Sequence, residues 1–322
     1  MRVEQLADKW EQISGSNAVK GYKSLRITSS CYSDVYLAIN EQGNHCLILS
    51  LPNDHDLKFK VIRKDKILLE YLADKSYVVM TLLDSDFNGL FDDLILSLFN
   101  AIKDIEDVAV YSKVFIQTFH RWVLFFTPEF SDKLPKDIVK GIFGELIVLK
   151  YLVKYLKYKD INDVLSGWVG PYDQGHDFVY DDRNIEVKTK DHKKVSVRIS
   201  GEHQLEIEAG KELILSVVSV TEDLINGASL KMLLQELKEL TFERFGDFSI
   251  VLKALHQKGL TLQNIVAYDN YRFKSEAITD YNCLEKGFPK IIPANLPSNI
   301  SNVKYDLNLT EMSKFILRVR EL

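Results

Sequence analysis

The sequence of 322 residues holds little cysteine, proline or glycine. Its three cysteines, Cys31, Cys46 and Cys283, are scattered and never spaced as C-x-x-C, which gives no basis for a disulfide framework or a thiolate zinc site. Seven prolines and 15 glycines are too few for a collagen-like or low-complexity chain. We therefore expect a folded protein of the reducing cytoplasm.

Long apolar runs and an excess of positive charge are also missing. The richest apolar stretches, residues 94–102 and 122–126, are shorter than the roughly 20 residues that a membrane span requires. Residues 1–14 have the mixed charges of an amphipathic helix and lack the apolar core of a signal peptide. The net charge of −5 gives no general attraction to nucleic acid or membranes, so any anion-binding surface must be local.

The motifs of several large enzyme classes are absent from the sequence as well. It contains no GxxxxGK[ST] phosphate loop, no GxGxxG, no HExxH and no GxSxG. Its seven histidines are dispersed, and no two of them have the spacing of metal ligands. The reaction classes that depend on these motifs are therefore disfavoured.

What the sequence does contain is core material for two domains, because 46% of its residues are hydrophobic. Apolar patterns predict a small sheet followed by two helices, and two prolines among the polar residues of 127–135 mark a boundary. We expect an α+β domain over residues 1–127, which could dock a partner or DNA, and a second domain over residues 128–322. The predicted strands are 25–27, 35–39, 46–51, 58–62 and 77–82, and the predicted helices are 86–103 and 105–126.

The second domain mixes helices and strands. A long helix is predicted over residues 136–155, and helical spacing returns at 229–240 and 248–258. Segments rich in branched residues predict strands, which together with these helices indicate an α+β or α/β fold. The predicted strands are 177–180, 184–188, 195–199, 213–220, 265–268 and 305–309.

Acidic residues occupy two of these strands, where apolar side chains are expected. With a turn at 181–184, Asp177 lies on one strand of a hairpin, and Glu186 and Lys188 share a face of the other. If the register brings both acids to one side, they converge with Lys188, which is costly in a half-buried setting unless a cation or an anion completes the site. Mg²⁺ is the natural candidate, because it prefers carboxylate and backbone oxygens. The alternative is a cross-strand ion pair of Asp177 with Lys188, with Glu186 facing solvent.

Glu145 adds a third acid among the apolar residues of the long helix. It could lie on a solvated flank and pair with a base one turn away. However, Gly141, Ile142, Val148 and Leu149 occupy the neighbouring positions, and none of them is basic. A buried role for Glu145 is therefore the preferred interpretation.

The order of these motifs resembles the PD-(D/E)XK nuclease superfamily. GxxGE (141–145), GWxGP (167–171), HDF (176–178) and EVK (186–188), followed by Gln204-Leu205 and Phe288-Pro289, are similar to a narrower bacterial group found with restriction-modification and phage-defence systems. His176 stands where the superfamily usually has proline. The resemblance implies a restriction-endonuclease-like core, a mixed central sheet flanked by helices, preceded by the smaller amino-terminal α+β domain.

The resemblance also implies a metal-dependent DNA endonuclease, or a nuclease subunit, that hydrolyses phosphodiesters with metal-activated water. It makes Asp177, Glu186, Lys188 and Glu145 the catalytic residues. The metal ligands would be Asp177, Glu186, the Val187 carbonyl and Glu145, with Mg²⁺ as the cofactor and Mn²⁺ as a substitute. His176 and Gln204 are candidate accessory residues, although an ordinary strand-edge histidine and an exposed glutamine are the alternatives. Trp168 is expected to be a packing anchor.

A short basic segment follows the EVK motif. It could track a DNA backbone, although lysine runs are usually solvated loops. Its candidate DNA-binding residues are Lys190, Lys193, Lys194 and Arg198.

Three functional readings remain open on the sequence. The first is a nuclease whose partners are DNA and a second copy or other subunits of a defence system, with no membrane involved. The second is a noncatalytic DNA-binding or assembly subunit that retains the nuclease fold. The third is an interaction protein that docks partners independently of nucleic acid.

Overall fold

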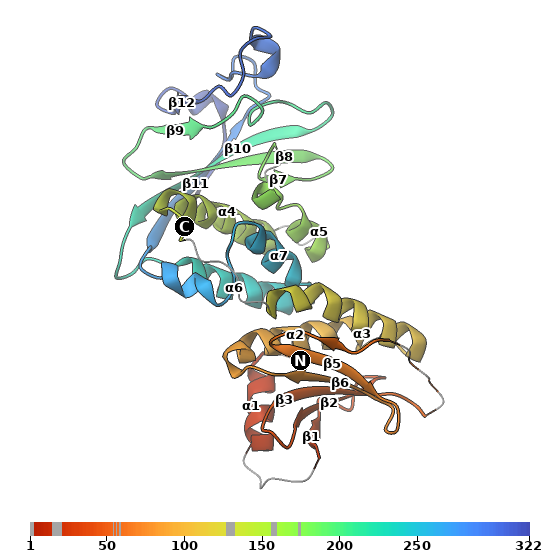
Figure 1. Ribbon diagram of the computed structural model, residues 1–322. Helices are drawn as coiled ribbons and strands as arrows, with labels where there is room; N and C mark the ends of the chain where they lie inside the picture. The colour runs from red at the N-terminus through yellow and green to blue at the C-terminus, as the bar shows by residue number, and fades with distance from the viewer. Residues whose placement is uncertain are drawn as a thin grey trace. The chain divides into compact units, whose positions relative to one another are not determined.

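The computed structural model describes residues 3–14, 21–53, 55, 57, 59–126, 133–155, 160–172 and 175–322 (Figure 1). The chain forms two compact units. The first comprises Met1–Glu129 and Phe245–Ser249, and the second comprises Phe130–Arg244 and Ile250–Leu322. Helices flank sheets in both, which confirms the predicted α+β fold class and is compatible with a restriction-endonuclease-like core. In the described part of the chain, no helix is both long and apolar enough to cross a bilayer.

A six-stranded antiparallel sheet forms the first unit, in the order β1-β2-β3-β6-β5-β4. In this register Leu37 lies opposite Leu47, which lies opposite Met80, and all three are fully buried on one face. Gly43 closes the turn after β2 with a φ of 82°, a left-handed conformation that favours glycine. The strands are β1 (Lys23–Arg26), β2 (Asp34–Ile39), β3 (His45–Ser50), β4 (Ile62–Arg63), β5 (Ile67–Leu72) and β6 (Tyr77–Leu82).

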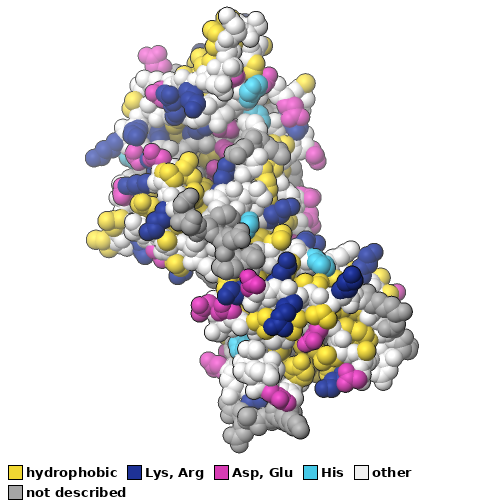
Figure 2. All heavy atoms as spheres, in the orientation of Figure 1, with side chains coloured by type: hydrophobic (Ala, Val, Ile, Leu, Met, Phe, Trp, Pro, Cys, Tyr) yellow, Lys and Arg dark blue, Asp and Glu magenta, His cyan; other side chains and the backbone are white. Residues whose placement is uncertain are grey.

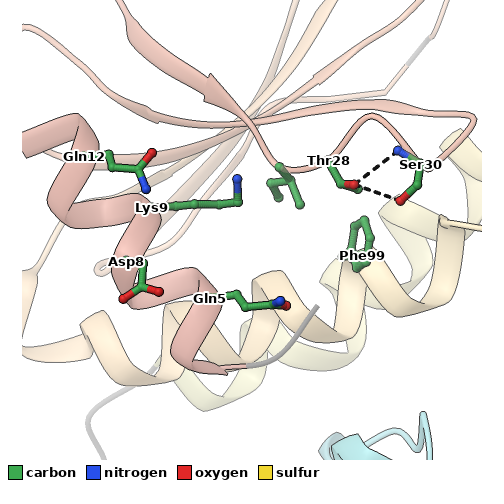
Figure 3. A pocket seen from close by; sticks show the side chains of 8 residues that line it. Gln5, Asp8, Lys9, Gln12, Thr28, Ser30 and Phe99 are labelled. Atoms are coloured by element: carbon green, nitrogen blue, oxygen red, sulfur yellow. Dashed lines mark hydrogen bonds between the residues drawn. The ribbon is translucent and has the colours of Figure 1, made fainter.

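Three helices accompany this sheet: α1 (Val3–Ser14), α2 (Asn88–Ile102) and α3 (Val108–Trp122), with 3-10 turns η1 (Ser85–Phe87) and η2 (Val123–Phe126). Trp10 Nε1 of α1 donates to Asp92 Oδ1 of α2 at 2.8 Å. A polar cavity of about 440 Å³ lies between α1, the segment after β1 and α2 (Figure 3). Its two charged lining residues, Asp8 and Lys9, have opposite signs, so the cavity carries no net charge.

The second unit is built on a five-stranded mixed sheet, in the order β13-β11-β10-β8-β7. β8 and β10 are parallel, and the other neighbours are antiparallel. A separate two-stranded sheet pairs β9 with β12. The strands are β7 (Phe178–Val179), β8 (Arg183–Asp191), β9 (Ser196–Ile199), β10 (Glu212–Glu222), β11 (Phe273–Asn282), β12 (Tyr305–Asn308) and β13 (Ile316–Glu321).

The two faces of this sheet have different neighbours. Helix α4 (Lys136–Tyr155) covers one face so closely that a Cβ atom added to Gly144 would lie 1.8 Å from Thr189 Oγ1 of β8. Glu186 and Lys188 point to the other face, because they are in register with Leu215 and Val217 of an apolar cluster that includes β9. The other helical segments are α5 (Ile161–Ser166), α6 (Leu230–Glu243), α7 (Ser249–Gln257) and the 3-10 turns η3 (Gly170–Tyr172), η4 (Asn264–Tyr268), η5 (Pro293–Asn295) and η6 (Ser313–Phe315).

Several predicted segments differ from the observed ones. The strand predicted at 265–268 is wrong, because this segment is the 3-10 turn η4. The turn before β8 starts one residue earlier than predicted, since Tyr180 N donates to Arg183 O at 2.9 Å and Arg183 already belongs to β8. Residues 1–2, 58 and 127–132 of the predicted segments lie outside the described residues. α5, β5, β11 and β13 were not predicted.

Candidate functional site

The GWxGP segment lies beside β7 and places the first acid. Val179 N donates to Gly167 O at 2.9 Å, and the Asp177 carbonyl accepts from Val169 N and Gly170 N at 2.8 and 2.9 Å. Gly170 must be small here, because a Cβ atom added to it would lie 2.6 Å from Asp177 Oδ1 and 2.9 Å from Glu145 Oε2. The carboxylates of Asp177 and Glu145 therefore meet beside Gly170.

Asp177 immediately precedes β7 and lies opposite Glu186, since Phe178 pairs with Ile185 in an antiparallel register. Its Oδ2 accepts a hydrogen bond of 2.7 Å from Val187 N. The N–H and C=O of one residue in a strand point to the same side, so the Val187 carbonyl is directed toward Asp177 as well. A carboxylate and a backbone carbonyl thus converge at the edge of β8.

Glu186 and Lys188 form a closed pair on the opposite side of β8 from α4. The Glu186 side chain is 2% exposed, and Lys188 Nζ lies 2.7 Å from its Oε1. The same ammonium donates to Gln204 Oε1 at 2.9 Å, and this oxygen also accepts from Ser200 N at 2.7 Å. Gln204 therefore contacts Lys188 directly and fixes the position of the ammonium.

Glu145 projects from α4 toward the same region. Its Oε2 accepts a hydrogen bond of 2.7 Å from Trp168 Nε1. Trp168 is 2% exposed, so it is a packing residue as predicted, and its indole N–H also orients Glu145. Glu145 is therefore buried with an indole partner, and the alternative of a solvated acid paired with a base one turn away on α4 is wrong.

The three acids resist ionisation together. Burial, and next the charge of Asp177, raise the pKa of Glu145 to about 8. Burial raises the pKa of Asp177, and this effect exceeds the lowering by the hydrogen bond from Val187 N. Burial and the charge of Asp177 also raise the pKa of Glu186 well above its usual range. At alkaline pH the three carboxylates therefore carry more negative charge than the two nearby ammonium groups, those of Lys188 and Lys258, compensate.

This charge makes the stability of the metal-free protein depend on pH. The folded pKa of Glu145 lies above its usual value of 4.5, so stability should fall as pH rises from 4.5 to about 8. Glu145→Gln removes this loss, and we expect its melting temperature to exceed that of the wild type at pH 8 and to approach it at pH 5. Thermal melts in EDTA test this, with the exposed Glu239→Gln as the control; parallel pH profiles for Glu145→Gln and wild type would contradict it.

The chemistry of these donors fits a divalent metal ion. All are hard oxygen ligands, and a cation would relieve the repulsion that raises the three pKa values. As arranged, however, no group of three or more His, Cys, Asp or Glu side chains among the described residues is placed to hold a metal. Each acid has a protein partner instead: Val187 N, Lys188 or Trp168. To bind a metal ion, Glu186 would have to give up its ion pair with Lys188 and coordinate the metal instead.

The predicted basic residues are brought together only in part. Lys190 donates to the His192 carbonyl at 3.2 Å, and Lys194 lies 3.3 Å from Asp191. Arg198 pairs with Asp306 of β12 at 3.2 Å, which removes its charge from a continuous patch. Figure 2 shows Lys and Arg side chains mixed with Asp and Glu over the visible face. The ion pairs of Lys194 and Arg198 therefore reduce the positive charge of this segment.

His176 and Lys258 complete the surroundings of the site. His176 is 9% exposed, and burial lowers its pKa. Lys258, just after α7, is close enough for its charge to lower the pKa values of both Glu145 and Asp177. Lys258 was not predicted, because it is distant in the chain from every motif and belongs to none of them.

The model of one family, described as "Putative PD-(D/E)XK family member, (DUF4420)", matches residues 6–310. No curated protein and no solved structure matches the chain.

Proposed function

We propose, because this chain belongs to the DUF4420 family of PD-(D/E)XK members, that it is a metal-dependent DNA endonuclease. The observation that carries the proposal is the convergence of Asp177, Glu186 and Lys188 at the β7–β8 edge, with Glu145 beside Asp177. We propose Mg²⁺ as the cofactor, with Mn²⁺ as a substitute, and action in the cytoplasm within a restriction or phage-defence system. The partners would be DNA and a second copy or other subunits of that system.

Each residue of the site would have its own role in phosphodiester hydrolysis. Asp177, Glu186 and the Val187 carbonyl would hold the metal, with Glu145 in support. When bound, a divalent ion polarises a phosphoryl oxygen and lowers the pKa of a water molecule. Lys188 would bind the scissile phosphate as a point charge once Glu186 releases it, and Gln204 keeps its ammonium in place. Trp168 holds Glu145 in its orientation.

The first test is cleavage of supercoiled and linear DNA by the purified chain. We expect cutting with Mg²⁺ or Mn²⁺ and none in EDTA. Conversion of supercoiled to open-circular DNA alone indicates nicking, whereas linear product indicates that both strands are cut. A wild-type chain that stays inert on every DNA with both metals would contradict an autonomous nuclease.

The closed Glu186–Lys188 pair supports a second candidate, a noncatalytic DNA-binding or assembly subunit. Such a subunit needs no metal at this position, and the ion pair would then be structural. DNA binding that is unchanged by EDTA, without cleavage under any condition, would favour this candidate over the first.

The exposed lysines after β8 give a prediction for either candidate. Each contact with a DNA phosphate contributes about −0.9 to the slope of log K against log salt concentration. Joint Lys193→Ala and Lys194→Ala substitution should weaken DNA binding at low salt and make this slope shallower by about 0.9 for each lost contact. Fluorescence anisotropy over a salt series measures it, with Lys231→Ala as the control. An unchanged slope would place the DNA elsewhere.

A further inference from the structure

Two adjoining cavities in the second unit form a cleft that the proposed nuclease site does not use. They have volumes of about 240 and 730 Å³ and share three lining residues, Tyr151, Tyr155 and Arg320. The smaller cavity lies between the carboxyl half of α4 and strands β8, β10, β11 and β13. The cleft is large enough for a ligand of small-molecule size.

The cleft lies on the α4 side of the sheet. Ile185 of β8 and Ser216 of β10 line it, and these residues alternate with Glu186 and Leu215, which point to the other face. The proposed catalytic pair of Glu186 and Lys188 is therefore on the opposite face of the sheet. A ligand in the cleft would occupy a separate site.

More basic than acidic side chains line the cleft. Six lining residues are basic and three are acidic. The basic residues are Lys150, Lys154, Arg183, Lys274, Arg318 and Arg320, and the acidic residues are Glu236, Asp280 and Glu321. Lys150, Arg183 and Lys274 are paired with Glu236, Asp182 and Glu276 at 2.8, 2.7 and 3.1 Å. The positive charge that favours an anionic ligand is therefore that of Lys154 and of Arg318 and Arg320, which share the one carboxylate of Asp280.

A buried carboxylate fixes two of the guanidinium groups. Asp280 accepts from Arg318 Nε at 2.9 Å, lies 2.7 Å from Arg320 Nη2 and accepts from Ser216 Oγ at 2.7 Å. One negative charge thus positions two positive ones. Within the described residues, Arg320 Nε is buried and has no hydrogen-bond acceptor, which is costly for a charged donor. Asp280 compensates only one of the two guanidinium charges, and a phosphate group would supply the second negative charge.

Aromatic rings lie next to these guanidinium groups. Arg320 Cζ is 4.1 Å from the centroid of the Tyr151 ring, whose own centroid lies 4.4 Å from that of Tyr155. Tyr155 is 54% exposed at the cleft, so part of its ring is accessible. Aromatic rings that bind planar bases, next to arginines that bind phosphate, are typical of nucleotide recognition.

We propose that this cleft is a nucleotide-binding site, with the phosphate bound by Arg318 and Arg320 and the base stacked on Tyr155. The chemistry is the same for a free mononucleotide and for the 5′-phosphorylated end of a single strand. Neither ligand requires a metal at Asp177, so the site is independent of the proposed catalytic function.

Titration calorimetry in EDTA tests the proposal with two probes, adenosine 5′-monophosphate and a 5′-phosphorylated dinucleotide. We expect Arg318→Gln to weaken binding of the recognised probe at least tenfold and Tyr155→Ala to weaken it several-fold. Inorganic phosphate binding should respond to Arg318→Gln and not to Tyr155→Ala. The control is Arg26→Gln, which removes an arginine paired with one aspartate in the first unit. Melting curves establish that each variant is folded.

The outcomes separate the ligand sources and the two functions. Binding of the mononucleotide assigns a free nucleotide, and binding of the dinucleotide alone assigns a strand end. Absence of binding of both probes to the wild type, or equal binding by wild type and Arg318→Gln, overturns the proposal. Asp177→Asn should bind the probes like the wild type, because the cleft does not include Asp177. A wild-type chain that cuts no DNA and still binds nucleotide would refute only the nuclease function.

Discussion

Asp177→Asn is expected to lower the rate of metal-dependent DNA cleavage roughly a thousandfold, the equivalent of about 4 kcal/mol in the activation free energy. The substitution removes the negative charge of one proposed metal ligand and leaves the shape of the side chain. The amide oxygen can still accept the hydrogen bond from Val187 N. Removing a charge from the crowded group of Asp177, Glu186 and Glu145 also relieves repulsion, so the variant should be at least as stable as the wild type.

The result is measured as the initial rate of plasmid cleavage with saturating Mg²⁺, together with a melting curve in EDTA. Asp163→Asn is the matched control, because this aspartate lies on α5 and is exposed, whereas Asp177 is buried among the acids. A rate for Asp177→Asn within threefold of the wild type would show that Asp177 is not a metal ligand. A rate loss accompanied by unfolding would be contrary to the expected gain in stability.

Gly144→Ala is expected to destabilise the protein by about 2 kcal/mol, the usual effect of forcing an extra methyl group into a packed contact. The new Cβ atom would lie 1.8 Å from Thr189 Oγ1, 3.0 Å from its Cβ and 3.3 Å from its Cγ2. Because Thr189 is a β-branched residue within β8, its side chain cannot turn away freely. Helix α4 would have to move from the sheet and carry Glu145 with it.

A second substitution identifies the contact that causes the loss. Thr189→Ala removes the two closest side-chain branches, so the double variant should recover most of the stability lost in Gly144→Ala. Gly141→Ala is the matched control on the same helix, since nothing lies within 4 Å of its added methyl group. It should gain up to about 1 kcal/mol from helix propensity. Chemical denaturation of the wild type and the four variants provides the measurements. Additive effects of Gly144→Ala and Thr189→Ala would rule out the contact.

The sequence was most informative where a residue was chemically out of place. Glu145 among apolar helix residues and Glu186 within a strand indicated buried acids, and the structure places both near Asp177. The Glu186–Lys188 pairing was not predicted, because the sequence placed both on one face without showing which partner each would choose. Lys258 could not be found at all, since only tertiary folding brings it toward the acids.

The same limit applies to the fold. Helix α4 was predicted with its observed bounds, because 20 residues of helical periodicity give a strong local signal. The segment 265–268 has the apolar pattern of a strand and forms a 3-10 turn, in which Ile265 and Tyr268 are buried by tertiary contacts. β13 was missed although it alternates as a strand does, because its polarity is inverted: Arg318 and Arg320 face Asp280 of β11, and the apolar Leu317 and Val319 are exposed. Such pairing between distant segments has no local signature.

The discontinuous composition of the first unit bears on how the protein is synthesised. Phe245–Ser249 belongs to this unit, where the Lys103 ammonium lies over the Phe245 ring and Arg121 lies 3.2 Å from Asp247. During translation, most of the unit leaves the ribosome long before this segment, which follows α4, β8, β10 and α6. The unit therefore cannot complete its native contacts until more than three quarters of the polypeptide has emerged. A gene fragment that ends at Phe126, the last residue of η2, would lack Phe245–Ser249 and the contacts that this segment makes in the first unit.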